Sequence, residues 1–265
     1  MTVEEWLGAD NKIGIDIWNG KYRDGDNSFE DDLTRISGND PEVRNSILNK
    51  EFLFGGRIVA NRGLSKRDRK ITMSNCYVLG VDDSIESIFD TARDLARTFS
   101  YGGGVGIDIG KLAPRGAKVN NAAKTTSGAV SFMDLYSTVT GLIGQEGRRG
   151  ALMISIPVNH PDIEEFITVK EDLQRVTKAN ISIRVTDEFM KCVKEDAPFK
   201  LYHKRESTGE ETIKWVNARD LYLKLAQCNW NTGEPGILFW DRIKSWNFLD
   251  TYENFEFAGV NPCAA

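Results

Sequence analysis

The spacing of apolar residues predicts helices in the first part of the chain and alternating strands and helices in the rest. Up to about residue 70, apolar side chains recur at helical spacing, as in IGIDIWNGKY and VRNSILNKEFLF, and Asp40-Pro41 suits the start of a helix. No strand-like alternation precedes residue 71. We therefore expect a helical region over residues 1–70 and a second region over residues 71–265.

From Cys76 onward, short apolar runs alternate with helical patterns. The predicted strands are CYVLGV, GVGIDIG, ALMISIPV, FKLYH, TIKWVNA, ANISIRV and ILFW. Helices are predicted for IESIFDTARDLARTFS after an Asp82-Asp83-Ser84 cap, for SGAVSFMDLYSTVTGLIG, for HPDIEEFITVK after a corner ending at Asp162, for TDEFMKCVKED with Thr186 as cap, and for ARDLYLKLAQCNW. This alternation indicates an α/β layer or barrel.

The glycine-rich segment YGGGVG does not match the two common nucleotide-binding loops. A phosphate loop requires G-x-x-x-x-G-K-[ST], and the dinucleotide fingerprint counted from Gly104 has Ile109 where its third glycine belongs. Two interpretations stay open. The turn lets one backbone pass close to another, or it is left bare so that a ligand can lie against the main chain.

Composition narrows the class of protein. Of 265 residues, 40% are hydrophobic and 28% are charged, which is typical of a soluble globular chain. The net charge of −5 provides no basic field for DNA, although a helix N-terminus and an arginine suffice for a small phosphorylated ligand. The polar N-terminus is unlike a signal peptide, and no apolar run approaches the ~18 residues of a membrane span. We expect a cytoplasmic protein with reduced thiols.

The cysteines and histidines do not form a metal-binding pattern. There are four cysteines, none in a C-x-x-C pair, and two histidines far apart in sequence, so no metal site is expected. Cys192 and Cys228 lie among apolar residues of predicted helices, and we assign them to packing. Taken singly, Cys76 and Cys263 would also be ordinary packing residues.

An ordered set of segments resembles the catalytic chains of ribonucleotide reductases, over roughly residues 50 to 263. The segments are SNCYVL, DDS, GGGVGIDIGKLAPRGA, SGAVSFMDLY, GRRGALMISIPVNHPDIEEFI, ANISIRVTDEFM, WNTGEPGILFWDRI and NPC. They are most similar to the adenosylcobalamin-dependent class, although classes with a separate radical-generating subunit share much of them. The resemblance implies the first half of a ten-stranded α/β barrel and the conversion of ribonucleotides to deoxyribonucleotides.

The resemblance assigns chemistry to three residues. Cys263 resembles the residue that becomes a thiyl radical and takes the 3′ hydrogen of the ribose. Asn261 resembles a residue that hydrogen-bonds the substrate, and Cys76 resembles one of two cysteines that supply an electron pair and close into a disulfide. The substrate diphosphate is expected near Gly56, Arg57, Asn75, Cys76 and Gly104.

The resemblance also implies an allosteric nucleotide site at a homodimer interface. Asp83, Ser84 and Ile85 match the start of the helix that binds the effector, with Asp83 accepting from its ribose. The loop 111–118 matches the segment that holds the effector phosphate. Ala113 stands where many relatives have a basic residue, so that Arg115 or Lys118 would substitute for it.

The loop 144–150 matches the loop that relays effector identity to the substrate base. Its glycines allow movement, and Arg148 and Arg149 can reach a phosphate or a base. A solvated basic turn is the plainer interpretation of that arginine pair.

The sequence departs from the family after Cys263. Ala264 and Ala265 follow, the second in the place of a glutamate that acts on the 3′-hydroxyl, and no second redox cysteine follows. The resemblance therefore implies an N-terminal half that is inactive alone and needs a complementary C-terminal half. A naturally split gene, such as one interrupted by an intein, is favoured over an artificially shortened chain or a decayed binding protein.

The partners follow from the same resemblance. For the complete enzyme it implies adenosylcobalamin, or alternatively a separate metal-radical subunit, together with a thioredoxin-type reductant, a nucleotide substrate and a deoxynucleoside triphosphate effector. No cofactor is expected on this portion alone. A non-catalytic nucleotide-binding module or an assembly module of the same fold is the alternative function.

Overall fold

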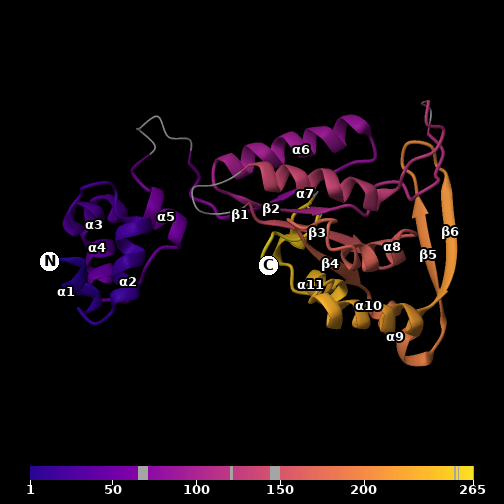
Figure 1. Ribbon diagram of the computed structural model, residues 1–265. Coiled ribbons are helices and arrows are strands. Elements are labelled where there is room, and N and C mark those ends of the chain that lie inside the picture. Colours follow the sequence, from indigo (N-terminus) through magenta and orange to yellow (C-terminus); the bar gives the residue numbers. More distant parts are fainter. Residues whose placement is uncertain (65–70, 120–121, 144–149, 254, 256, 265) are drawn as a thin grey trace. The chain divides into compact units, whose positions relative to one another are not determined.

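The protein is described here by a computed structural model that covers all residues except 65–70, 120–121, 144–149, 254, 256 and 265. The chain divides into two compact units, Met1–Asn75 and Cys76–Ala265, which are coloured in sequence order in Figure 1. The boundary expected at residue 70 falls on a segment outside the described residues.

The first unit consists of short helices packed around aromatic side chains. Its helices are α1 (Val3–Leu7), α2 (Lys12–Ile17), the π-helical turn η1 (Trp18–Tyr22), α3 (Phe29–Ser37), α4 (Pro41–Leu48) and α5 (Gly56–Asn61). The rings of Trp6, Trp18 and Phe29 are buried together, and the last two have centroids 5.1 Å apart. As expected, Asp40 caps α4 by accepting hydrogen bonds from the backbone N–H groups of Glu42 and Val43.

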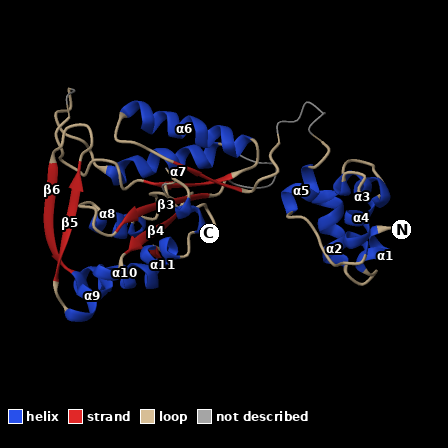
Figure 2. Ribbon diagram, turned by 180° about the vertical axis from the view of Figure 1, so that it is seen from behind, coloured by secondary structure: helices blue, strands red, loops and turns tan. Residues whose placement is uncertain are grey.

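A five-stranded parallel sheet organises the second unit. Its strands are β1 (Cys76–Leu79), β2 (Gly104–Asp108), β3 (Leu152–Pro157), β4 (Asn180–Val185) and β7 (Gly236–Phe239). They pair in the order β1-β2-β3-β4-β7, so that each strand lies beside the next one of the sheet in sequence. This order never reverses, which fits half of a barrel and excludes the strand order of a doubly wound sheet. Figure 2 shows the strands in red.

Helices pack against both faces of this sheet. They are α6 (Ile85–Ser100), η2 (Ala129–Ser131), α7 (Phe132–Leu142), α8 (Ile163–Thr168), η3 (Val169–Glu171), α9 (Asp187–Glu195), α10 (Ala218–Thr232), α11 (Trp240–Ser245) and η4 (Phe248–Thr251). Val105 and Ile107 of β2 pack in one buried cluster with Leu95 and Phe99 of α6 and Phe166 of α8. Because side chains alternate along a strand, the other face of β2 carries the residues between them.

A separate antiparallel hairpin, β5 (Pro198–Lys204) and β6 (Glu211–Asn217), joins α9 to α10. On β5 the buried residues Phe199, Leu201 and His203 alternate with more exposed ones, which is the pattern of a strand with one covered face. The turn of the hairpin reaches the loop 111–118, as described below for Arg205.

The predicted elements are confirmed with a few corrections. The helix expected over residues 127–144 is regular only from Phe132 to Leu142, because Gly128 has a φ of 93° and a 3-10 turn follows it. The helical pattern after Val43 ends at Leu48, and Lys50 has a φ of 60°. Asp162 does not cap its own helix, since its carboxylate accepts from other segments. No helix in the described part of the chain is both long and apolar enough to cross a membrane.

Candidate functional site

Cys76 and Cys263 face each other although 187 residues separate them. Their Sγ atoms lie 3.7 Å apart, with Cys76 at the first position of β1 and Cys263 in the C-terminal loop. Burial, and next the contact with Cys263, raise the pKa of the Cys76 thiol above its ordinary value of 9.0, so that it stays protonated at neutral pH.

Two glycines of β2 make room for the loop that carries Cys263. A Cβ built on Gly106 would lie 1.7 Å from the carbonyl oxygen of Val260, and one on Gly104 would lie 2.9 Å from Cγ of Pro262. The loop therefore runs along this face of β2 in the opposite direction to the strand. Of the two interpretations of the glycine-rich segment, close approach of two backbones is the one observed. Gly104 also pairs with Cys76 in the sheet register.

The tip of the loop is a turn built around Asn261. Its side-chain oxygen accepts from the backbone N–H of Cys263 at 3.0 Å, and its carbonyl accepts from Ala264 N–H at 2.9 Å. Val260, one position earlier, is buried with Met153 and Leu238 of the sheet. An apolar anchor followed by this turn fixes the backbone from which the exposed Cys263 thiol projects.

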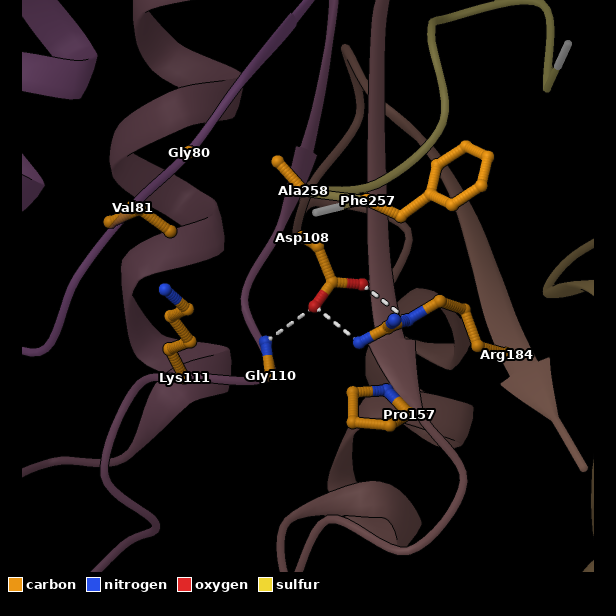
Figure 3. A pocket seen from close by; sticks show the side chains of 9 residues that line it. All are labelled: Gly80, Val81, Asp108, Gly110, Lys111, Pro157, Arg184, Phe257 and Ala258. Carbon is orange, nitrogen blue, oxygen red and sulfur yellow. Dashed lines mark hydrogen bonds and ion pairs between the residues drawn. The ribbon is translucent and has the colours of Figure 1, made fainter. Parts of the chain in front are cut away.

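An ion pair between buried Asp108 and partly buried Arg184 lies beside the start of the same loop. Asp108, the last residue of β2, accepts from Arg184 Nη2 at 2.8 Å, from Ser155 Oγ at 2.6 Å and from Gly110 N–H at 3.0 Å. Burial raises the pKa of the Asp108 carboxyl, and the charge of Arg184 opposes that rise. Figure 3 shows the pair in a pocket of about 230 Å³, with Phe257 of the loop beside it.

The residues expected to bind an effector lie together around the loop 111–118. Asp83 accepts from the backbone N–H of Ala113 at 3.0 Å and from Arg205 Nε at 2.5 Å. Ser84 caps α6 through Ser87 N–H, and Ile85, the first residue of that helix, is exposed. The carboxylate expected to bind a ribose is thus already paired with a cation.

The two basic residues proposed for the effector phosphate are engaged as well. Arg115 forms a two-point ion pair with Glu165, with contacts of 2.6 and 3.0 Å, and this pairing raises the pKa of the guanidinium. The backbone N–H of Lys118 donates to Glu210 at 3.3 Å, while its carbonyl accepts from Arg205. Arg148 and Arg149, predicted for the loop that relays effector identity to the substrate base, lie outside the described residues.

A buried histidine holds the other side of that loop. His160 Nε2 lies 2.9 Å from the carbonyl oxygen of Leu112, and His160 Nδ1 accepts from Asp162 N–H at 3.0 Å. Both ring nitrogens are therefore used by a neutral imidazole. Burial lowers the pKa of His160 from 6.5 to about 4, while the Leu112 carbonyl opposes that shift.

The expected substrate residues fall in both units. Cys76, Gly104, Asn261 and Cys263 belong to the second unit. Gly56, Arg57 and Asn75 belong to the first: Gly56 begins α5, Arg57 follows it, and Asn75 is the residue before Cys76. The structure thus brings the two sulfur atoms and Gly104 together, and the phosphate role of the first-unit residues stays a prediction.

Sequence reasoning missed Asp108, Arg184 and Arg205. Asp108 continues the alternation Gly104, Gly106 along β2, and Arg184 is a lone charge in the apolar run ANISIRV. A charge in a buried strand requires a partner, which was the available signal for that pair. Arg205 sits in a hairpin turn among other charged residues, and nothing local distinguishes it.

The described residues do not by themselves fit a metal ion or a corrinoid. Among them, no group of three or more histidine, cysteine, aspartate or glutamate side chains is placed to hold a metal. The pocket beneath the loop, at about 230 Å³, is smaller than the ~300–1,000 Å³ of pockets for drug-sized ligands, and adenosylcobalamin is larger still.

Comparison with known proteins shows similarity to ribonucleotide reductases. A family model described as "Ribonucleotide reductase, barrel domain" matches residues 74–264. The vitamin B12-dependent ribonucleoside-diphosphate reductase of Thermoplasma acidophilum is 36% identical over 193 residues, which cover 72% of this chain and 24% of that protein. The protein of the same name from Mycobacterium tuberculosis is 33% identical over 219 residues, covering 82% of this chain and 30% of that protein.

A more distant relative carries a different name. The ribonucleoside-diphosphate reductase subunit alpha of Helicobacter pylori is 27% identical over 206 residues, covering 68% of this chain and 26% of that protein. Over all three relatives, the chain spans 24–30% of the length of the matched protein.

Proposed function

This chain belongs to the ribonucleotide reductase family, and we propose that it provides the radical cysteine and the first redox cysteine of an enzyme that converts ribonucleotides to deoxyribonucleotides. The observation that carries the proposal is the 3.7 Å separation between the sulfur atoms of Cys76 and Cys263. Two packing cysteines from distant segments have no reason to meet at the tip of a loop whose path requires two glycines.

In the proposed reaction, each residue has one task. The Cys263 sulfur, as a thiyl radical, takes the 3′ hydrogen of the ribose, which makes the neighbouring C2′–O bond labile so that the 2′-hydroxyl leaves as water. After reduction at C2′, the Cys263 thiol returns a hydrogen to C3′ and becomes the thiyl radical again. Cys76 and a second cysteine supply the electron pair and two hydrogens, and close into a disulfide. The raised pKa of Cys76 suits this task, because the thiol must still carry its proton when the substrate arrives.

Substrate binding is proposed for residues around the two sulfurs. Gly104 leaves the start of β2 without a side chain beside Cys76, and Asn261 lies two residues before Cys263. Gly56, Arg57 and Asn75 would contact the diphosphate. The effector would bind at Asp83, Ser84 and Ile85, with its phosphates at Arg115 or Lys118. Arg148 and Arg149 would relay the identity of the effector to the substrate base.

The complete enzyme would need further components. We propose adenosylcobalamin as its cofactor because two relatives are named as vitamin B12-dependent, with a separate metal-radical subunit as the alternative. A thioredoxin-type reductant would reopen the disulfide in a reducing compartment such as the cytoplasm. A homodimer formed through the effector-site helices and a complementary C-terminal half complete the proposed assembly, as in a split or intein-interrupted gene.

We propose that the 265-residue chain does not turn over by itself. Ala265 stands in the place of the glutamate, and the five described parallel strands do not close into a barrel. Ala265 also favours the second candidate, a non-catalytic nucleotide-binding or assembly module. The two candidates differ in whether a complementary half restores chemistry.

Complementation tests the proposal. The chain is mixed with a polypeptide of the Thermoplasma acidophilum relative that begins after its matching cysteine, together with adenosylcobalamin, a dithiol and a ribonucleoside diphosphate. Deoxynucleotide should form with the mixture and with a Cys192→Ser variant, but not with either half alone or with Cys263→Ser. Association of the halves without any product would instead support the assembly module.

A further inference from the structure

Burial of the ion pair of Asp108 and Arg184 costs desolvation free energy. Neither residue takes part in the proposed reaction. Asp108 is buried at the carboxyl end of β2, whereas Gly104, beside Cys76, stands at the opposite end of the strand. Replacing a buried ion pair by apolar residues is often neutral or stabilising, so overall stability alone is a weak reason for its presence. A role in fixing one arrangement of the surrounding chain is the alternative.

The pair lies at the point where the cysteine loop starts. Gly104, Gly106 and Asp108 share one face of β2, and they meet Pro262, Val260 and Gly259 in turn. At the last of these contacts, a Cβ built on Gly259 would lie 3.3 Å from Cβ of Asp108. Asp108 thus contacts the loop at Gly259, where the loop begins to follow β2.

Arg184 reaches the loop by a second path. Its guanidinium lies over the ring of Trp240, with 4.4 Å between Cζ and the ring centroid. The Trp240 ring contacts the Phe257 ring edge to face, at 5.6 Å between centroids. Figure 3 shows Phe257 and Ala258 next to the pair. Both members of the pair therefore contact the first residues of the loop, directly or through one aromatic ring.

We propose that Asp108 and Arg184 are positioning residues that fix where the loop 257–264 enters the sheet and thereby hold the Cys263 thiol opposite Cys76. Gly259 and Val260 of the loop lie against Asp108 and Gly106 of β2. A slip by one residue would move the thiol by about 3.3 Å and turn it to the other side. Thiol placement matters through the proposed reductase function, but the placement itself can be measured without that activity.

The test measures how quickly the thiols of Cys76 and Cys263 form a disulfide with each other. With oxidised glutathione, one thiolate of the pair attacks the glutathione disulfide and releases one glutathione. The other thiolate then attacks the mixed disulfide and releases the second glutathione, so that two electrons pass to glutathione. Only well-placed sulfurs close the Cys76–Cys263 bond quickly, because disulfide geometry is specific. Peptide mapping by mass spectrometry after acid quenching measures the rate of closure.

The variants are Arg184→Gln, Asp108→Asn and the double substitution in the full chain. Each single change should slow closure by about tenfold or more, since misplacement of reacting atoms by about 1 Å costs up to a hundredfold. The double variant should be no slower than the slower single one, because the two residues act as one unit. The matched control is Arg175→Gln, which breaks an arginine–aspartate pair with Asp134 (2.7 Å) on α7, away from the loop.

The outcomes decide the proposal. Closure in folded Arg184→Gln within about twofold of the parent rate, or an equal slowing in Arg175→Gln, would overturn it. If the Gln and Asn variants fail to fold, Arg184→Lys keeps the charge but loses the planar fork, and it should still slow closure by severalfold; an unchanged rate in that variant would also overturn the proposal. Absence of reductase activity after complementation, with these rates as expected, would instead contradict the proposed function alone.

Discussion

The carbonyl oxygen of Val260 occupies the space in which a side chain at Gly106 would stand. A Cβ built on Gly106 would lie 1.7 Å from that oxygen, and no side-chain rotation relieves a clash with backbone. The loop can therefore lie against β2 only because position 106 is a glycine. The position of Cys263 depends on that close contact.

Gly106→Ala should displace the loop rather than unfold the protein. Overpacking of this kind costs about 1–3 kcal/mol of unfolding free energy, and relief is available only by moving residues 259–261 off β2. We expect closure of the Cys76–Cys263 disulfide to fall by at least about tenfold. The control is Gly80→Ala, because no atom lies within 4 Å of a Cβ built there. Equal closure rates in the two variants would contradict the match described here.

Substitutions of Asp83 and Arg205 should change the affinity for the effector in opposite directions. The Asp83 carboxylate is the proposed ribose acceptor, yet Arg205 already occupies one of its oxygens. Asp83→Ala should weaken binding of a deoxynucleoside triphosphate by about ten- to a hundredfold, because a charge-assisted hydrogen bond is worth ~1.5–3 kcal/mol. Arg205→Gln should strengthen it, because the carboxylate is released. Calorimetric titration measures both, with Cys263→Ala expected to bind like the parent.

The result of that titration separates two roles of Asp83. If both Asp83→Ala and Arg205→Gln weaken binding, the pair anchors the loop 111–118 and does not compete with the nucleotide. If neither variant changes the affinity, the effector site has been misplaced. Binding should also promote self-association, which sedimentation at the same nucleotide concentrations detects.

Burial of neutral His160 predicts a loss of stability in weak acid. Its pKa falls from 6.5 to about 4 through burial; Asp162 raises that pKa and His203 lowers it. The unfolded chain binds a proton below pH 6.5, while the folded chain resists it until about pH 4. The stabilising contribution is thus complete above pH 6.5 and lost as the pH falls toward 4. Denaturant unfolding should show about 3 kcal/mol of extra acid sensitivity.

The matched variant for that measurement is His160→Gln. Its amide can still donate to the Leu112 carbonyl but has no proton to gain in this range. Carboxylates also titrate near pH 4, so the informative quantity is the difference between the two proteins. Parallel unfolding curves of parent and variant from pH 7 to pH 4 would refute the assignment of a neutral, buried imidazole.

The fold was largely predictable because its signals are local. Apolar runs gave the strands, the Thr186 and Asp40 side chains cap helices as expected, and the ordered segments pointed to the barrel. Cys76 and Cys263 were singled out through family resemblance, since nothing local marks either cysteine. The partners of Asp108 and Asp83 were missed because Arg184 lies 76 residues and Arg205 lies 122 residues away. Such pairs depend on how elements pack, which periodicity does not encode.

The thiol of Cys76 makes the last prediction. Burial is the larger cause of its raised pKa, and the contact with Cys263 is the next. Alkylation of Cys76 by iodoacetamide proceeds through the thiolate. The midpoint of its rate–pH profile should therefore lie above the ordinary value of 9.0. Cys263→Ala removes the sulfur contact and leaves the burial, so the midpoint should move down without returning fully to that value. Mass spectrometry of the Cys76 peptide measures the profile, and a midpoint below 9.0 in the parent protein would show that this thiol is not held in its protonated form.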